Sequence, residues 1–308
     1  MNRLQANLCL ICVTLCWSTE VIIFACIPND VLPFATSFIT SAIAVLILVA
    51  SFFKRIKAEM KRNAKRILLR CVFLGIIKCG YDVLFLYGLN YFDVSTGAFT
   101  FSITVVVLPV ILLTMKKNVS PKTWLSALLV LAGIVCALGS QVFGNQIIGL
   151  MLMLIGCILR AVFIIRLNDF AKEHDSITLS VLISSIGAAI SFCIWMFLQP
   201  QTFGAIEWSP TIIASLFIYA YFIVAFAQTL NIFAQKRATA SGATVIYSLE
   251  IVFSLIWSAV LPETLIDRVI PTPFQVIGAL LIVAGSIIEI VDFDFNGRRK
   301  NEVKKQEL

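Results

Sequence analysis

Long apolar stretches separated by short polar breaks dominate the pattern of the chain. Most are long enough for a helix to cross a bilayer, which needs about 20 mostly apolar residues. Barrel strands would instead alternate apolar and polar residues over about ten positions. The pattern therefore predicts an all-α integral membrane protein with ten transmembrane helices. The stretches are 4–27, 31–53, 67–89, 95–115, 124–138, 147–165, 177–198, 212–234, 240–261 and 274–291, the fifth reaching full length only with Ser140 and Val142.

Composition agrees with this pattern, because 60% of the 308 residues are hydrophobic and 13% are charged. A soluble domain is nearer half apolar and a quarter charged, and a disordered chain carries more charge still. Both classes are excluded, and the lipid bilayer is an expected partner. No small-residue cleavage site follows the first stretch, so we expect a retained helix rather than a removed signal peptide.

The basic residues are distributed unevenly between alternate breaks. Of the 24 lysines and arginines, 21 fall at the two ends of the chain or in the breaks after the second, fourth, sixth and eighth stretches. The other breaks hold only Arg268. Basic residues accumulate on the cytoplasmic side of a membrane protein. We therefore predict cytoplasmic N- and C-termini in a multi-pass protein of the cell inner (plasma) membrane. The net charge of +7 is then an orientation signal, and no nucleic-acid partner is expected.

The stretches contain no histidine and no catalytic pair of side chains. The nine cysteines all lie inside apolar stretches, and the single histidine, His174, lies in a polar break. This placement argues against a disulfide framework and a zinc hydrolase. The sequence also contains no Gly-rich phosphate-binding motif. We expect no enzyme activity, no cofactor and no metal. An intramembrane enzyme is the alternative outside transport.

Two short matches relate the halves of the chain. Ser-Thr-Gly-Ala at 95–98 matches Ala-Ser-Gly-Ala at 240–243, and Leu-Val-Leu-Ala-Gly at 129–133 matches Leu-Ile-Val-Ala-Gly at 281–285. Five spans repeated once place the second copy in the opposite orientation. Inverted repeats are typical of secondary transporters, which bind substrate between the repeats near the midplane. We predict inverted five-helix repeats over 1–141 and 142–295, followed by a basic cytoplasmic tail over 296–308.

Several of these motifs resemble the drug/metabolite transporter superfamily in its EamA-type branch. The similar segments are Cys-Trp-Ser at 16–18, Ala-Ser-Gly-Ala at 240–243, Leu-Glu at 249–250, Pro-Glu at 262–263, and Gln-Val-Ile-Gly-Ala-Leu-Leu-Ile at 275–282 with Gly285. The resemblance implies the ten-helix fold and the transport of small metabolites such as amino acids, nucleotide conjugates, cations or drugs. Ile251 and Thr104 stand where the family pattern has proline, and Lys117 where it has an acidic residue. The fold carries over, whereas a substrate does not.

Five ionisable residues lie well inside the stretches: Glu20, Lys78, Asp82, Arg160 and Glu250. Each costs roughly 2.5–3.5 kcal/mol on the insertion scale when it faces lipid. We therefore expect them to face one another or a watery cavity. Lys78 and Asp82 are four residues apart on one helix face and can pair. Arg160 has an alternative, because its long side chain can reach the cytoplasmic interface.

These residues define the candidate site for substrate binding or coupling, together with Trp17, Tyr81, Gln228 and Asn231. The two amides either line the cavity or bond between helices. Charges of both signs suit a zwitterion, so we expect a secondary-active carrier of an amino acid or related small polar metabolite, working by alternating access and exporting it. Glu20 or Glu250 would carry a coupling proton. A drug or cationic-metabolite exporter and an uptake system for a nucleoside-like nutrient are the alternatives, and monomer and homodimer both remain open.

Overall fold

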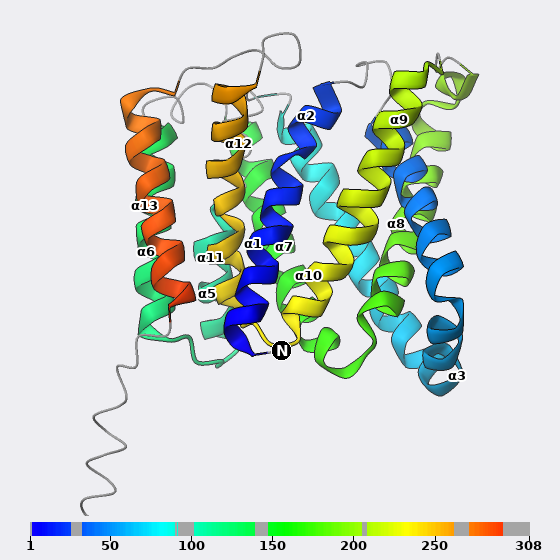
Figure 1. The fold of residues 1–308 in the computed structure, drawn as a ribbon, viewed down its shortest axis with the longest axis horizontal. Helices are drawn as coiled ribbons and strands as arrows, with labels where there is room; N and C mark the ends of the chain where they lie inside the picture. The colour runs from blue at the N-terminus through cyan, green and yellow to red at the C-terminus, as the bar shows by residue number, and fades with distance from the viewer. Residues whose placement is uncertain are drawn as a thin grey trace, which may run out of the picture.

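The computed structural model describes residues 2–25, 33–89, 91, 102–138, 147–204, 208–261 and 271–291. Every regular element within these ranges is a helix, and the helices run side by side as one bundle (Figure 1). The predicted all-α class is therefore confirmed for the described residues. The repeat match at 95–98, the Pro-Glu pair at 262–263 and the predicted tail at 296–308 lie outside them.

Most of the helices follow the predicted apolar stretches closely. In the first half they are α1 (Arg3–Ser18), α2 (Glu20–Ala25), α3 (Pro33–Leu89), α5 (Thr104–Thr114) and α6 (Pro121–Leu138). In the second half they are α7 (Ile147–Glu173), α8 (Ser176–Leu198), the 3-10 helix η2 (Pro200–Gly204), α9 (Pro210–Ile218), the π-helix η3 (Tyr219–Ala227), α10 (Gln228–Gln235), α11 (Ala240–Tyr247), α12 (Leu249–Val260) and α13 (Pro273–Ile290).

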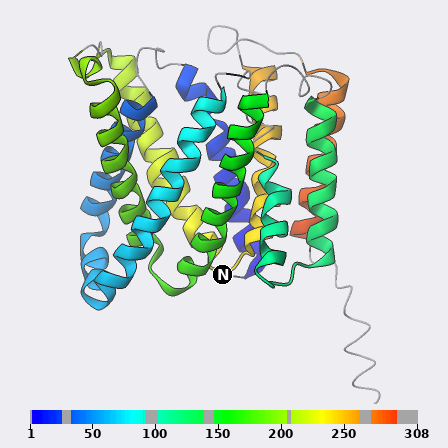
Figure 2. The same ribbon diagram turned by 180° about the vertical axis from the view of Figure 1, so that it is seen from behind.

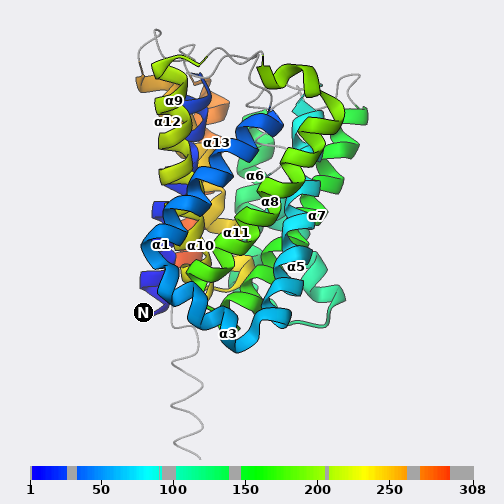
Figure 3. The same cartoon turned by 90° about the vertical axis from the view of Figure 1, so that its right-hand side faces the viewer.

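Helix α3 differs from the prediction of two helices joined by a polar break. Its backbone leaves helical geometry only at Phe52 (φ −129°, ψ 22°) and Asn63 (φ −145°, ψ 31°). At these bends the helix turns back on itself, so that its two long limbs run in opposite directions (Figure 3). The connection between the bends is helical because Lys, Arg, Ala, Glu and Met, all strong helix formers, fill it.

Three predicted stretches contain an irregularity near their middle. The first stretch is divided at Thr19, whose hydroxyl donates to the carbonyl of Cys16 at 2.7 Å. The ninth is divided at Ser248, between α11 and α12. The eighth changes from α-helix to π-helix at Tyr219 and back at Gln228. Short π segments inside helices are frequent at functional sites, so η3 marks a place where a functional site is expected.

The outer surface of the bundle has the character of a membrane protein. Large apolar side chains point away from the bundle, including Leu46 (69% exposed), Leu69 (71%) and Phe197 (86%). Six helices among the described residues are long and apolar enough to cross a membrane, and 3–18, 104–114 and 121–137 form shorter apolar helices. The chain is therefore an all-helical, multi-pass membrane protein.

One end of the bundle gathers the N-terminus and four of the connections. Figures 1 and 2 place the beginning of α1, the bend of α3, the α5–α6 link, the α7–α8 corner and the α10–α11 turn at the same end. Two of these connections begin the next helix with a polar cap: Asp175 accepts from the backbone of Thr178, and Thr239 from that of Gly242. Such caps satisfy backbone groups that the first helical turn leaves unpaired.

Helices α6 and α13 form one edge of the bundle and come from different halves of the chain (Figure 1). Gly133 and Gly278 lie at their crossing, and a Cβ atom built on Gly278 would lie 2.5 Å from the carbonyl oxygen of Gly133 and 2.8 Å from the Cβ of Ala137. Small residues let helix backbones approach closely in membranes. This contact holds the two halves of the chain together at that edge.

Gly278→Ala should destabilise the protein, because the added methyl group meets backbone that cannot move aside without separating α6 from α13. We expect a cost of about 1–3 kcal/mol, seen as a lower melting temperature of the purified protein in detergent. Gly187→Ala in α8 is the matched control, since no heavy atom lies within 4 Å of its new Cβ. Equal melting temperatures for the two variants would contradict the close contact.

Candidate functional site

The five ionisable residues inside the predicted spans come together from four helices. Glu20 begins α2, Lys78 and Asp82 lie on the second limb of α3, Arg160 lies in α7, and Glu250 lies in the first turn of α12. Glu20 interacts electrostatically with Lys78, Asp82 and Glu250. Arg160 interacts with Glu250 in the same way. We call these five residues the interior charge group.

The closest contact in the interior charge group is the predicted pair on α3. The Lys78 ammonium donates to the Asp82 carboxylate, with 2.6 Å between Nζ and Oδ2. Both side chains keep partial exposure, at 36% and 42%. The Lys78 nitrogen also lies 5.8 Å from the centre of the Tyr81 ring, and that ring meets Phe163 of α7 edge-on. Attraction within one helix face therefore neutralises this charge locally.

Glu20 is held by a residue of the neighbouring π-helix η3. The Tyr219 hydroxyl donates to the Glu20 carboxylate at 2.7 Å, although the two residues are 199 positions apart in sequence. Glu20 stands here because the chain breaks at Thr19 and starts a new helix with it, while Tyr219 is the first residue of η3. Both irregular helices thus contribute directly to this contact.

Arg160 and Glu250 join the group through longer-range attraction. Glu250 is partly exposed, and within the described residues it has no ion pair within 4 Å. Arg160 is also partly exposed and acts electrostatically on Tyr81 and Tyr247 as well as on Glu250. The sequence left two placements open for Arg160, facing the other interior charges or reaching the cytoplasmic interface. In the structure its charge acts on the interior charge group.

A second polar group is fully buried beside the interior charge group. The Tyr247 hydroxyl donates to the side-chain oxygen of Asn231 and accepts from the Gln235 amide at 2.8 Å. Asn168 of α7 then donates to the carbonyl oxygens of Gln235 and Ala238, each at 2.9 Å. These bonds fix the α10–α11 turn against α7, so Asn231 serves here as a bond between helices.

The remaining predicted residues flank this buried group. The Trp17 ring contacts the Tyr247 ring with 5.3 Å between their centres, which places α1 against α11. The next residue, Ser18, accepts from the indole of Trp257 in α12 at 2.9 Å. The Gln228 side-chain nitrogen is buried and has no hydrogen-bond partner within the described residues. An unpaired buried amide is costly, so Gln228 has a donor to offer to a bound molecule.

Sequence reasoning missed the parts of this site that depend on long-range contacts. Tyr219, Tyr247, Gln235 and Asn168 were not among the predicted site residues. Their signal is a polar side chain inside an apolar stretch, for the two tyrosines, or close after the end of one, for Gln235 and Asn168. That signal identifies candidates without identifying partners. Their partners lie on other helices, at distances along the chain that no local pattern connects.

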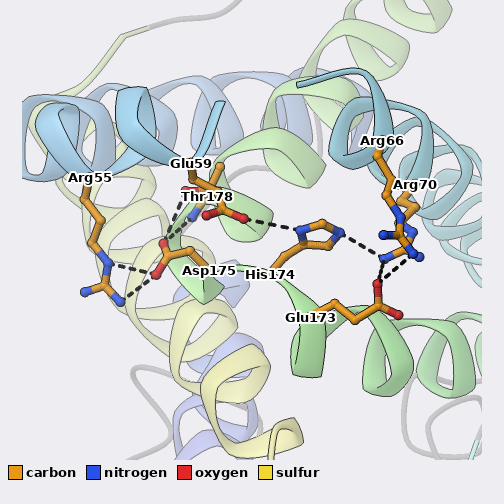
Figure 4. A network of polar contacts seen from close by, with 8 residues as sticks. All are labelled: Arg55, Glu59, Arg66, Arg70, Glu173, His174, Asp175 and Thr178. Carbon is orange, nitrogen blue, oxygen red and sulfur yellow. Dashed lines mark hydrogen bonds and ion pairs between the residues drawn. The ribbon is translucent and has the colours of Figure 1, made fainter. Parts of the chain in front are cut away.

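The bend of α3 and the α7–α8 corner form an ion cluster that joins the two halves of the chain (Figure 4). Arg55 donates from Nε to Asp175 at 2.8 Å. Glu173 accepts from Arg70 at 2.6 Å and lies 3.2 Å from Arg66. We call these residues, with Glu59 and His174, the corner cluster. The acidic residues of the corner cluster pair with Arg55, Arg66 and Arg70, which served in the sequence analysis only as an orientation signal.

His174 occupies the centre of the corner cluster (Figure 4). Its side chain is only 2% exposed, with Nδ1 3.3 Å from Glu59 and Nε2 2.9 Å from Arg70. Because a guanidinium can only donate, this geometry makes Nε2 the acceptor and leaves the proton on Nδ1, facing Glu59. The Arg70 guanidinium also stacks on the Phe170 ring at 4.6 Å. His174, which the sequence placed in a polar break, is therefore buried and joins the two halves of the chain.

Comparison with known proteins identifies the family of this bundle. The sequence profile described as the EamA-like transporter family matches residues 4–139 and, a second time, residues 140–290. The chain belongs to the EamA-like transporter family. It is accordingly a transmembrane transporter of the drug/metabolite transporter superfamily and not an enzyme, as the resemblance and the missing catalytic residues predicted.

Two proteins are similar to this chain over nearly its whole length. An uncharacterised transporter of Archaeoglobus fulgidus is 29% identical over 295 residues, covering 94% of this chain and 86% of the relative. A protein of known crystal structure superposes with a TM-score of 0.75 at 18% identity, covering 92% of this chain and 96% of the other. The second similarity concerns the fold alone.

Arg70→Gln should weaken the junction between the halves, because it removes the bonds to Glu173 and His174 and the stacking on Phe170. Hydrogen bonds to charged groups contribute about 1.5–3 kcal/mol, so we expect a loss of about 2 kcal/mol in unfolding free energy. Arg237→Gln is the control, since Arg237 is exposed at the same end of the bundle. Chemical denaturation of both variants in detergent measures the difference, and an equal loss would contradict a stabilising corner cluster.

Proposed function

We propose that this EamA-like transporter is a secondary-active carrier of a small polar metabolite with both charges, an amino acid or related zwitterion, and that it works by alternating access in the direction of export. The observation that carries the proposal is the interior charge group. It contains two cations and three carboxylates, contributed by both halves of the chain. Transporters built from repeats bind their substrates between the repeats near the midplane.

Each residue of the predicted site receives a role in this proposal. Lys78 or Arg160 would take the substrate carboxylate, and Glu20 or Glu250 its amine. Four further residues would line the path: Trp17, Tyr81, Gln228 and Asn231. Gln228 is the best supported of these, because its buried nitrogen has no partner in the described part of the chain. Costly charges inside a membrane protein generally mark substrate or ion pathways.

Glu20 or Glu250 would also carry a coupling proton. Neither carboxylate has an ion pair within 4 Å in the described residues, whereas Asp82 is paired with Lys78 at 2.6 Å. A carboxylate outside a tight ion pair can change its protonation state without stranding a buried cation.

A second candidate substrate is a cationic metabolite or drug. The interior charge group carries one more carboxylate than it has cations. After Lys78 pairs with Asp82, the remaining side chains are Glu20, Glu250 and Arg160, which together are negative. An excess negative charge attracts a cation, and exporting it would need no group to bind a substrate carboxylate.

We place the chain in the cell inner (plasma) membrane with ten spans, cytoplasmic termini, inverted repeats over 1–141 and 142–295, and a basic tail over 296–308. Support comes from the end of the bundle that gathers the beginning of α1 and the connections after the predicted even-numbered spans (Figures 1 and 2). The exposed basic residues of the α3 bend lie at that same end. Basic connections favour the cytoplasmic side.

Reporter fusions test this topology. Fusions truncated after Lys117 and after Arg237 should yield fluorescent green fluorescent protein and inactive alkaline phosphatase, because both sites follow basic connections. Fusions after Gln199 and after Pro271 should give the reverse result. The opposite pattern at all four sites would show that the predicted orientation is inverted. The same result at two consecutive sites would show that the predicted number of spans between them is wrong.

Counterflow in proteoliposomes tests the transport proposal. Purified protein should exchange at least one radiolabelled amino acid from a panel that also contains nucleotides and polyamines. Glu250→Gln should slow that exchange about tenfold or more, because a bond to a charged group contributes about 1.5–3 kcal/mol and 1.4 kcal/mol is a factor of ten. Asp169→Asn, whose carboxylate pairs with Lys117 at the end of α7, is the matched control and should exchange normally.

The outcomes of this assay separate the alternatives. Exchange of polyamines without amino acids would select the cationic substrate class. No exchange with any member of the panel would contradict a carrier of polar metabolites. If Glu250→Gln and Glu20→Gln both kept the wild-type pH dependence of exchange, neither residue would carry a coupling proton.

A further inference from the structure

The short helical segment between the bends of α3 has two distinct faces. Its partly buried positions are Ile56, Glu59 and Met60, which recur at three and four residues and form one face. Lys54, Lys57 and Lys61, at intervals of three and four, form the opposite face and are all exposed. We call these three residues, with the neighbouring Arg62 and Lys65, the basic face.

The buried face fixes this segment to the rest of the bundle. Ile56 packs on the hydrophobic cluster that contains Leu48 and Val181, and Met60 packs on the larger cluster that contains Ile67 and Leu179. Glu59 lies 3.3 Å from His174 in the corner cluster. The segment is therefore held in one orientation, and this orientation directs the basic face away from the protein.

The basic face has no bound opposite charge among the residues that the structure describes. All five of its side chains are exposed, and none of them forms a hydrogen bond or ion pair among the described residues. The nearby acidic residues Glu59, Glu173 and Asp175 are already bound to His174, Arg66, Arg70 and Arg55. Four of these positive charges thus lie on the segment between the bends, and Lys65 lies two residues after the second bend; none has a bound carboxylate among the described residues.

The basic face begins where the lipid-facing surface ends. Leu46 on the first limb of α3 is 69% exposed, and Phe53, directly after the first bend, is 57% exposed. The Lys57 ammonium lies 5.8 Å from the centre of the Phe53 ring, so the apolar and basic surfaces are continuous. The bend also lies at the outer edge of the bundle in both Figure 1 and Figure 2. A partner of this face therefore has an apolar part beside Phe53 and an anionic part beside Lys57.

We propose that the basic face is a docking site for the headgroups of anionic phospholipids in the cytoplasmic leaflet. The acyl chains would lie along Leu46 and Phe53 while the phosphates contact Lys54, Lys57 and Lys61. Basic clusters directly beside a transmembrane helix attract anionic headgroups. The inference rests on the orientation given under the proposed function and is independent of the substrate. Because the other face of the same segment carries Glu59, bound lipid would hold the corner cluster together.

Lipid titration of the full chain tests this docking site. The protein is purified in neutral detergent and titrated with phosphatidylglycerol or phosphatidylcholine, and bound lipid is counted by native mass spectrometry. We expect phosphatidylglycerol to bind more tightly. The triple variant Lys54→Gln, Lys57→Gln, Lys61→Gln should lose about tenfold or more of that affinity. The matching Lys→Arg triple should retain it, because the charge is unchanged.

The control variant removes the same charge elsewhere at the same end of the bundle: Lys116→Gln, Lys236→Gln, Arg237→Gln. It should change the affinity for phosphatidylglycerol less than about twofold. An equal loss of affinity in the two Lys/Arg→Gln triple variants would overturn a specific site, because any positive charge at this end of the bundle would then serve equally well.

Two competitors distinguish a lipid headgroup from other anions. Inorganic phosphate and polyglutamate should leave bound phosphatidylglycerol in place at equal charge concentration, because neither contains the apolar part that lies along Phe53. Displacement by phosphate would make this a free-phosphate site, and displacement by polyglutamate an acidic-polymer site; either result overturns the proposal.

This assay contains no transport substrate, so its failure is separate from failure of the counterflow assay. Inverted reporter fusions would leave the docking site but move it to the outer leaflet, which would contradict the leaflet named here.

Discussion

An ionisable side chain inside a membrane protein must meet an opposite charge, a hydrogen-bond donor or water, and this requirement organises the centre of the bundle. A charge that faces lipid instead costs several kilocalories per mole. Lys78 meets Asp82 at 2.6 Å, and Glu20 meets the Tyr219 hydroxyl at 2.7 Å. Arg160 and Glu250 attract each other over a longer distance. The helices must be placed so that all of these contacts form together.

The same arrangement explains where the helices are regular and where they are not. At the edge of the bundle, α6 and α13 are joined by backbone contact at Gly133 and Gly278. At the centre, the chain breaks at Thr19 and Ser248 and changes to a π-helix at Tyr219. Close packing needs regular helices, whereas a polar site needs side chains aimed at one point. The alternating-access mechanism proposed above would use both, with rigid edges that move about a central site.

The sequence predicted the features that depend on short-range patterns. Apolar length predicted the helices, and the four-residue interval placed Lys78 and Asp82 on one helix face, where they can pair. It did not predict that the basic break after the second stretch is helical, because polar composition alone does not distinguish a loop from an exposed helix. Nor did it predict the bond of Glu20 to Tyr219 or the burial of His174 between Glu59 and Arg70. These depend on packing between helices that are more than 100 residues apart.

The most direct test of mutual neutralisation is a double-mutant cycle on Lys78 and Asp82. The unfolding free energies of Lys78→Gln, Asp82→Asn and the double variant are measured in one detergent. Each single variant should be destabilised because it strands the partner's charge, and the double variant should recover part of the loss. Since both side chains are partly exposed, we predict a coupling energy of about 1 kcal/mol. Strictly additive losses would contradict the account, because each charge would then be stabilised without the other.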